Sequence, residues 1–414
     1  MPSSWSLHGP EGEDWRVPVA ELTDRQHALA EELRARGLGG ALVQHPVDLY
    51  YLAGGRQNGV LWIPASEDGA CIQFVRRSLD RARFEAGGSD APHEVHPMPR
   101  SSEFEDVLMA SGAEGTIALQ HGSVPSKDVA WWSGTLGGFG SLADATPAVH
   151  SVRSVKSRWE LEQMEAAAVI QHRMFEAIEA EGGEGSTELE LASVAESISR
   201  SEGFGGRVFL RRWPMDCDRA VVVAGRAGGV SSYFDSAIGG TGPHPLAGMG
   251  SGFGRVRSNE PVLVDLLHLH RGYIVDATRM FSAGPLDRVW TERLEDMLTI
   301  QDAVVESLGR GDACSAAWVR GHDLAKEMGH ADHLMGMAPD QSRFLGHSVG
   351  LELDESPVVA QGFDAPMPIG GTMAIEPKVV HMEGCIGIED TWTRTEEGLR
   401  RITAGESLPW HIEW

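Results

Sequence analysis

Cysteine is scarce in this chain. Its four cysteines, Cys71, Cys217, Cys314 and Cys385, are scattered along the sequence and form no CxxC pair. Disulfide-stabilised domains usually carry a dense, even set of cysteines. The spacing therefore argues against a disulfide framework and predicts free thiols in a reducing compartment, each serving as a small residue of the core.

Positive charge is also in short supply. Lysine and arginine number 35 against 60 aspartates and glutamates, which gives a formal net charge of -25. A surface of that sign repels nucleic-acid phosphates and anionic lipids. We therefore expect no nucleic-acid partner, and we interpret the negative charge as a source of solubility.

Long apolar runs are absent as well. No stretch is apolar for long enough to span a bilayer, and the first residues, MPSSWSLHGPEGEDW, have neither the basic nor the apolar region of a secretion signal. The chain is 42% hydrophobic and 23% charged, which is ordinary for a globular protein, and its 414 residues suffice for about two or three domains. These features predict a soluble cytoplasmic protein with no membrane partner.

Glycine, in contrast, is abundant, and it concentrates in residues 203–254, which contain AGRAGG, IGGTG and GMGSGFG. Such density predicts tightly turning loops. None of these sequences is a P-loop, and none has the strand-to-helix context of a dinucleotide-binding GxGxxG motif. A nucleotide cofactor is therefore not expected.

The first part of the chain, residues 1–152, has the pattern of a small α/β domain. A capping-box pattern in residues 23–26 predicts the start of a helix that ends before Gly37. Strand-like runs follow at ALVQH, YYL, GVLWIP and ACIQFV, then a helix over residues 104–111 and a strand at TIALQH. Few ionisable side chains gather here, so we expect a scaffold, a specificity wall or a dimerisation domain.

The second part, residues 153–414, begins with two predicted helices. Capping boxes that pair Ser157 with Glu160 and Thr187 with Glu190 start them, and glycines near residues 182 and 203 end them. Two more helices are predicted over residues 286–308 and 314–328. The remainder, residues 346–403, returns to strands, so this part also has a mixed α/β pattern.

Two aspartates interrupt an apolar segment in the middle of this second part. Asp265 and Asp276 lie in PVLVDLLHLH and GYIVDATRMF, which have the composition of buried strands joined by a turn. A turn centred between His270 and Arg271 places the two aspartates directly opposite each other. Facing carboxylates repel, and a buried pair needs a cation, a shared proton or an arginine. The segment therefore raises the question of a metal.

A second acidic pair and a histidine follow. Glu376 lies in MAIEPKVV and Glu389 in GIED, and a turn at residues 382–383 sets them opposite each other across a second hairpin. His347, in GHSVG, is by itself more typical of a structural histidine than of a ligand. Two carboxylate pairs with one imidazole form a ligand set that suits two divalent cations such as Mn, Co, Fe or Zn.

The order of these five residues resembles a known family. VDLLHLHRGYIVDATRMF, GHSVGLELDESP, MAIEPKVV and GIEDTWTRTEEGL are similar to the motifs of the "pita-bread" metallopeptidases, which include methionine aminopeptidase, aminopeptidase P, prolidase and creatinase. The resemblance implies an α/β (α+β) fold. A C-terminal pita-bread catalytic domain, residues 153–414, would have a curved antiparallel sheet and covering helices. Residues 1–152 resemble the creatinase-type N-terminal domain, which makes a homodimer the expected assembly.

The resemblance also implies a chemistry. Asp265 and Asp276 would hold one metal, His347 and Glu376 would complete the other, and Asp276, Glu389 and a water or hydroxide would bridge them. Two divalent ions, manganese first and cobalt, iron or zinc as alternatives, would supply hydroxide at neutral pH and polarise the scissile carbonyl. Glu376, close to that water, is the expected general base.

Three positions depart from the pattern of the family's peptidases. Asp354 stands where a second histidine is usual, so we expect it to take a different part in proton transfer or substrate contact. Gly387 stands where prolidase and aminopeptidase P commonly carry an arginine. His244, in GTGPHPLAG, has the spacing of a third catalytic histidine in an untypical context. Arg211, Arg212 and Trp213 are candidates for shaping a pocket.

Three functions are compatible with these residues. The first is a metallohydrolase that resembles Xaa-Pro aminopeptidase or Xaa-Pro dipeptidase and cleaves an amide bond of a peptide or small amide. The alternative is a non-peptidase enzyme on the same fold, either a small-amide hydrolase or a metal-dependent lyase resembling dimethylsulfoniopropionate lyase, and the changes at Asp354 and Gly387 motivate it. The third is a binding module without catalysis, which the complete ligand set disfavours.

Overall fold

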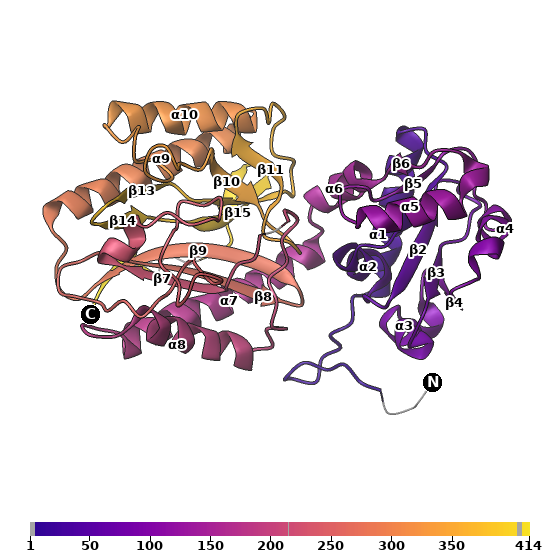
Figure 1. Ribbon diagram of the computed structural model, residues 1–414, viewed down its shortest axis with the longest axis horizontal. Helices are drawn as coiled ribbons and strands as arrows, with labels where there is room; N and C mark the ends of the chain where they lie inside the picture. Colours follow the sequence, from indigo (N-terminus) through magenta and orange to yellow (C-terminus); the bar gives the residue numbers. More distant parts are fainter. Residues whose placement is uncertain (1–4, 214, 404–407) are drawn as a thin grey trace. The chain divides into compact units, whose positions relative to one another are not determined.

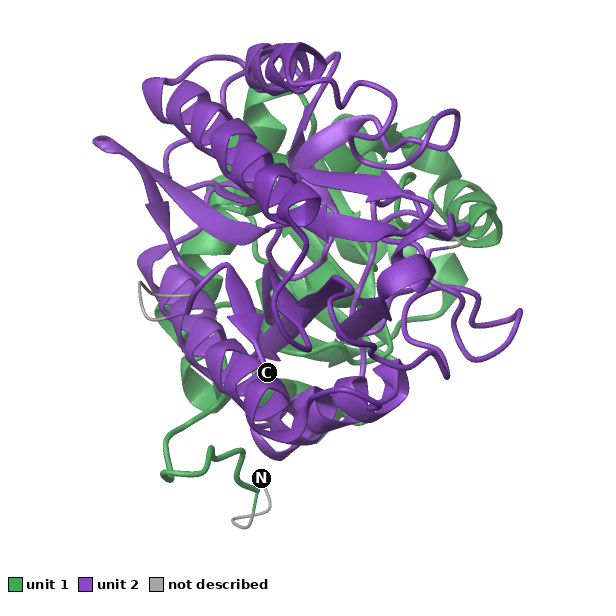
Figure 2. Cartoon of the chain, turned by 90° about the vertical axis from the view of Figure 1, so that its left-hand side faces the viewer, with its two compact units in different colours: residues 1–153 green, residues 154–414 purple. Residues whose placement is uncertain are grey.

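The computed structural model describes residues 5–213, 215–403 and 408–414. The chain divides into two compact units, residues 1–153 and residues 154–414 (Figure 2). Each unit has an apolar core of its own. Among the described residues, no helix combines the length and the apolar character needed to cross a membrane.

The first unit is built on one six-stranded sheet with the strand order β4-β3-β2-β1-β5-β6. Strands β1, β2 and β3 pair antiparallel, whereas β4, β5 and β6 join in parallel. The elements are α1 (Val19–Ala35), β1 (Gly40–Val43), α2 (Pro46–Ala53), β2 (Gly59–Pro64), β3 (Ile72–Val75), α3 (Leu79–Glu85), β4 (Glu94–Pro97), α4 (Phe104–Ala110), β5 (Ile117–Leu119), α5 (Ser126–Thr135), β6 (Ala143–Asp144) and α6 (Thr146–Ser154), with short 3-10 turns at Gly88–Asp90, Ser101–Glu103 and Gly137–Phe139.

Two sequence predictions for this unit are wrong. Helix α1 begins at Val19 and not in residues 23–26, because Pro18 occupies the N-cap and the Thr23 hydroxyl donates to the carbonyl of Val19 instead of capping. The YYL run lies in helix α2 and not in a strand. Pro46 at the first helical position and Gly54, left-handed at the C-cap with a φ of 76°, are the usual start and stop signals of a helix.

The second unit has two sheets and a separate hairpin. The sheets have the orders β17-β9-β8-β7 and β11-β10-β12-β15-β16, and β13 pairs with β14. The elements are α7 (Arg158–Glu181), α8 (Glu188–Ser201), β7 (Ala220–Ala224), η4 (Gly225–Gly229), β8 (Val262–His270), β9 (Tyr273–Ser282), α9 (Arg288–Arg310), α10 (Cys314–Glu327), β10 (Phe344–Ser348), β11 (Glu355–Ala360), β12 (Thr372–Ile375), β13 (Lys378–His381), β14 (Gly384–Gly387), β15 (Asp390–Thr395), β16 (Gly398–Arg401) and β17 (His411–Glu413).

The helices of this unit enclose the sheets from two sides. Helices α7 and α8 pack on β7, β8 and β9, and helices α9 and α10 lie on the opposite side, against strands of the other sheet (Figure 1). Both predicted capping boxes are present, Ser157 with Glu160 and Thr187 with Glu190. The predicted class, mainly antiparallel sheets with covering helices after a smaller α/β unit, is confirmed. Strand β7, AVVVA, was missed because it lies inside the glycine-dense region.

Alternation along β8 and β9 sends opposite faces of the hairpin to different cores. Leu263 and Met280 face the core under α9 and α10, whereas Val264 and Phe281 pack toward α7 and α8. Because side chains alternate along a strand, Asp265 shares the face of Leu263. The acidic residues therefore lie on the inner face of this sheet, between the two sheets.

The predicted register of this hairpin is wrong by two residues. The turn consists of Arg271 and Gly272, with φ angles of 49° and 93°, and His270 pairs with Tyr273. Positive φ at both turn residues matches the twist of the strands. Asp265 therefore faces Thr278, and Asp276 faces Leu267. A slip by an even number of residues keeps side chains on the same face, so both aspartates still point inward.

The second predicted hairpin is confirmed. Met382 and Glu383 form its turn, and β13 pairs with β14 so that Lys378 faces Gly387 and His381 faces Gly384. Continued beyond the paired strands, this register places Glu376 opposite Glu389.

A buried ion pair joins β9 to the start of β15. The Arg279 guanidinium donates to the Asp390 carboxylate at 3.0 Å and to the carbonyls of Thr278 and Glu389 at 2.8 and 2.9 Å. Neither Arg279 nor Asp390 has any exposed side-chain surface. Because Glu389 adjoins Asp390, this pair fixes the backbone that presents the Glu389 carboxylate.

Replacing Arg279 with methionine should destabilise the second unit by about 3 kcal/mol, because the buried Asp390 carboxylate loses its closest ionic partner and keeps the more distant Arg401, at 3.4 Å. The free energy of unfolding in urea measures this change. Arg288→Met is the matched control, because Arg288 and its partner Glu292 lie on the surface, with side chains 89% and 52% exposed. Equal stability losses in the two variants would contradict the structural role of the buried pair.

Candidate metal centre

The second unit contains a cavity of about 370 Å³ between its sheets. All five predicted metal ligands line it: Asp265, Asp276, His347, Glu376 and Glu389. They come from two sheets, since the aspartates lie on β8 and β9, the histidine lies on β10, Glu376 follows β12 and Glu389 precedes β15. The fold thus brings five residues that are far apart in the sequence together on the wall of one cavity.

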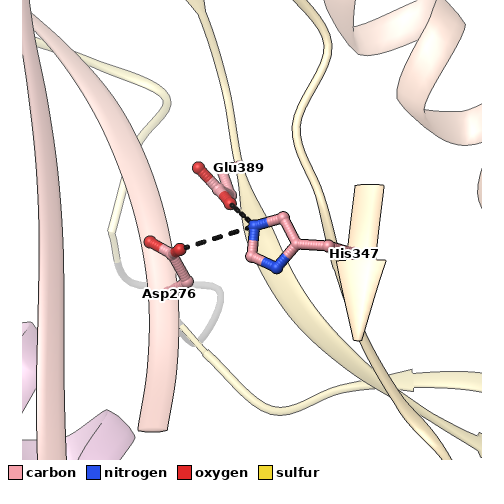
Figure 3. A group of neighbouring side chains, drawn as sticks. All are labelled: Asp276, His347 and Glu389. Carbon is pink, nitrogen blue, oxygen red and sulfur yellow. Dashed lines mark ion pairs between the residues drawn. The ribbon is translucent and has the colours of Figure 1, made fainter. Parts of the chain in front are cut away.

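Three of these side chains form a compact group, drawn in Figure 3. Asp276, His347 and Glu389 each offer a ligand atom, and these atoms all lie within 4.8 Å of one another. The His347 Nε2 atom is 3.9 Å from Asp276 Oδ2 and 4.0 Å from Glu389 Oε1. Asp276 Oδ1 and Glu389 Oε1 are buried without a hydrogen-bond partner. Buried oxygens without a donor fit a divalent cation, which binds carboxylate and imidazole at about 2.0–2.2 Å.

Glu376 and Asp265 lie beside this group. Glu376 Oε1 is 3.3 Å from His347 Nε2, close enough to join the same ion. Asp265 faces a different cationic group, the ammonium of Lys378, whose Nζ lies 3.9 Å from Asp265 Oδ2. The two aspartates share one face of the β8-β9 hairpin but have different neighbours. Asp276 lies next to His347, whereas Asp265 lies next to Lys378.

Lys378 is the site residue that the sequence reasoning missed. Its side chain is fully buried, and its Nζ donates to Glu376 Oε2 at 2.6 Å and to Glu389 Oε2 at 2.7 Å. Thr278 also donates to Glu389 Oε2, at 3.0 Å. The signal was present in MAIEPKVV, because a lysine in a strand-like apolar run next to an acidic residue requires a buried partner.

Burial and mutual repulsion control the ionisation of these carboxyls. Burial and the neighbouring Glu389 and Asp265 raise the pKa of Asp276 well above its ordinary value. Burial and Glu376 raise the pKa of Glu389 to about 8. Glu376 is different: burial opposes its ionisation, but Lys378 and then His347 lower its pKa to about 2. Lys378 favours the ionised form of both glutamates, and the additional hydrogen bond from His347 favours it further at Glu376.

Asp354 anchors a loop at the edge of the cavity. Its carboxylate accepts hydrogen bonds from the backbone N–H groups of Arg211 and Arg212, at 2.6 and 3.1 Å. The Arg212 side chain bonds both Asp354 and Asp235. Asp354, Arg211 and Arg212 all line the cavity, so the carboxylate holds a wall segment in place.

The structure does not bring the remaining candidates to the cavity. His244 is exposed in a short turn, where its carbonyl accepts from the N–H of Ala247, and it is not among the residues that line the cavity. Trp213 is 92% exposed. Gly387 faces Lys378 across the β13-β14 hairpin, and a Cβ atom at Gly387 would lie 2.2 Å from Lys378 Cγ.

Metal binding should release more protons at about pH 6 than at about pH 9, because the ion needs the ionised carboxylates. A carboxyl whose pKa is raised keeps its proton up to that pKa, so Glu389 is largely protonated below about pH 8 and ionised above it. Calorimetric titration with Mn²⁺ in buffers of different ionisation enthalpy measures the release. Equal release at the two pH values would contradict the raised pKa.

Asp354→Ala should lower kcat/KM by about 10–100-fold, the usual effect of removing a group that positions an active site, whereas Asp354→Asn should lose less, because its amide oxygen can still accept from one of the two backbone N–H groups. Steady-state kinetics over a range of pH compares the two variants. If Asp354 transferred protons instead, the asparagine variant would be as impaired as the alanine variant and the pH profile would change.

Family models match both units of the chain. The model described as "Metallopeptidase family M24" matches residues 162–396, and the model described as "Creatinase/Prolidase N-terminal domain" matches residues 25–155. The first match contains all five predicted ligands. It also spans more than half of the chain.

Similar proteins extend over nearly the whole sequence. The chain is 24% identical to an Xaa-Pro dipeptidase of Pyrococcus furiosus, covering 93% of this chain and 99% of the relative, and 26% identical to an Xaa-Pro dipeptidase of Pyrococcus horikoshii, covering 93% and 98%. The crystal structure of dipeptidase PepE from Mycobacterium ulcerans superposes with a TM-score of 0.78 at 22% identity, covering 96% of this chain and 100% of that one. The prolidase from Pyrococcus horikoshii gives 0.74 at 21% identity, covering 92% and 99%. These structures share the fold of the chain.

Proposed function

The chain belongs to metallopeptidase family M24 and is a metal-dependent hydrolase, and we propose that it cleaves Xaa-Pro dipeptides. The observation that carries the proposal is the buried group of Asp276, His347 and Glu389 on the wall of a cavity large enough for a dipeptide. The full-length similarity to two Xaa-Pro dipeptidases supports the choice of substrate. The reported relatives are peptidases, so none of them favours the alternative of a small-amide hydrolase or a lyase.

The residues of the cavity have two proposed roles, metal binding and general-base catalysis. Asp276, His347 and Glu389, with Glu376 beside them, would hold a divalent cation, for which we retain manganese first and cobalt, iron or zinc as alternatives. Such an ion lowers the pKa of bound water and polarises a carbonyl oxygen. Glu376 is the proposed general base, because it is ionised at neutral pH and His347 and Lys378 hold its carboxylate in place. The two ions with a bridging hydroxide that the resemblance implies would have to share these carboxylates with the Lys378 ammonium.

A cation at the cavity wall suits the free carboxylate of a dipeptide. Arg343, just before β10, lines the cavity, is exposed, and forms no ion pair within the described part of the chain. Arg211 and Arg212 line the same cavity, but the Arg211 guanidinium bonds the Ser356 hydroxyl and Arg212 is already paired with Asp235. We therefore assign the substrate carboxylate to Arg343, in place of the arginine that prolidases commonly carry at the position of Gly387. A cytoplasmic homodimer remains the proposed setting.

A panel of Xaa-Pro dipeptides and their C-terminal amides, supplied with Mn²⁺, Co²⁺, Fe²⁺ or Zn²⁺, tests this function. We expect metal-dependent release of proline with the dipeptides preferred over the amides. Asp276→Ala should lower kcat/KM by at least about 100-fold, because loss of a ligand costs no less than loss of its supporting partner. Arg343→Ala should raise KM for dipeptides and leave the amides unchanged.

The control for these variants is Arg288→Ala, which removes an exposed arginine outside the cavity and should leave both substrates unaffected. Absence of turnover with every metal across the panel would refute the proposed function. Equal turnover of dipeptides and amides by the unmodified enzyme would refute the assignment of Arg343 alone.

A further inference from the structure

We propose that the ammonium of Lys378 permanently fills one of the two cation positions of this centre, so that the protein binds a single divalent ion. The inference rests on the proposed function only in requiring that the centre bind metal. The remaining ion would take Asp276, His347 and Glu389, with Glu376 beside them. We base the proposal on how His347 and Lys378 share the carboxylate oxygens of Glu376 and Glu389.

The four oxygens of Glu376 and Glu389 face two different partners. Both Oε1 atoms point toward His347, whose Nε2 lies 3.3 Å from that of Glu376 and 4.0 Å from that of Glu389. Both Oε2 atoms accept from Lys378 Nζ, at 2.6 and 2.7 Å. The glutamates thus separate two cation positions. On the imidazole side Glu389 Oε1 has no donor, whereas on the other side both Oε2 atoms are satisfied by the ammonium.

The ammonium and a second metal ion exclude each other. A divalent ion that used both Oε2 atoms would lie about 2.0–2.2 Å from each of them, which is the space that Lys378 Nζ occupies. Thr278 donates to the same Glu389 oxygen at 3.0 Å, and Asp265 Oδ2 lies 3.9 Å from the ammonium. Lys378 therefore has the carboxylate surroundings that would otherwise belong to an ion.

Lys378 is a fully buried part of the β13-β14 hairpin and does not lie on its surface. Its side chain has no exposed surface, and its backbone carbonyl accepts from the N–H of Met335 at 2.8 Å. It also needs a glycine opposite, because a Cβ atom at Gly387 would lie 2.2 Å from Lys378 Cγ and 2.7 Å from Lys378 Cβ. Lys378 and Gly387 are direct cross-strand partners. Because Gly387 has no side chain, it leaves the space through which the Lys378 side chain reaches the carboxylates.

One ammonium cannot replace both ions. Asp265, Asp276, Glu376 and Glu389 bring four carboxylates into the cavity, and a single positive charge leaves most of that repulsion in place. Asp276 Oδ1 and Glu389 Oε1 still lack any donor. The geometry therefore points to one lysine and one divalent ion together. In such a centre Lys378 is a positioning residue that orients Glu376 and Glu389 around the ion.

The test is the number of manganese ions bound by the full chain. Protein stripped with a chelator and reloaded with MnCl₂ should contain about one ion per chain by elemental analysis, and its electron paramagnetic resonance spectrum should be that of an isolated Mn²⁺ ion. Lys378→Ala removes the ammonium, and Gly387 leaves the space open, so this variant should bind about two ions and show the spectrum of a coupled pair.

Lys156→Ala is the matched control, because it also removes a buried lysine from a carboxylate, that of Glu355, without opening a cation position between the glutamates. It should stay at one ion per chain. Two ions in the unmodified protein would overturn the inference and leave the proposed function intact, whereas no bound ion would overturn both. Because the unmodified protein decides between these results, a Lys378 variant that fails to fold does not prevent the test.

Discussion

Repulsion between buried carboxylates is the constraint on which the second unit depends. Asp265, Asp276, Glu376 and Glu389 converge between two sheets, where the pKa of Asp276 and Glu389 is raised by burial and by their neighbours. Such a group persists only with positive charge inside it. The ammonium of Lys378 supplies part of that charge, and a divalent ion held with the help of the neutral His347 imidazole would supply the rest.

The rest of the fold holds these charges at fixed positions. Strands β8 and β9 direct their aspartates inward by simple alternation, with helices α7 and α8 covering the other face. The buried pair of Arg279 and Asp390 fixes the backbone at Glu389, and Asp354 fixes the loop of Arg211 and Arg212. Positioning by neighbours that do not touch the metal is a general feature of such centres. Such positioning allows groups that bind a metal weakly on their own to bind it together.

Much of this arrangement could be predicted from the sequence, and the failures have physical causes. Capping boxes, glycine stops and the turn at residues 382–383 are local signals, and they gave helices α7 and α8 and the β13-β14 hairpin correctly. The β8-β9 register failed because a two-residue turn of Arg271 and Gly272 depends on backbone twist, which composition does not show. Lys378 was missed although Glu376 lies two residues away, because the sequence does not show that the lysine side chain is buried between the two glutamates. Asp354 obtains its anchoring contacts from a loop far along the chain.

The central claim is that Lys378 is one of the cations of this metal centre. A crystal structure of the manganese-loaded protein, with anomalous scattering used to locate the metal, tests it most directly. We expect one anomalous peak among Asp276, His347 and Glu389, with Lys378 Nζ still bonded to Glu376 and Glu389. Two peaks, one of them at the position of the displaced ammonium, would contradict it.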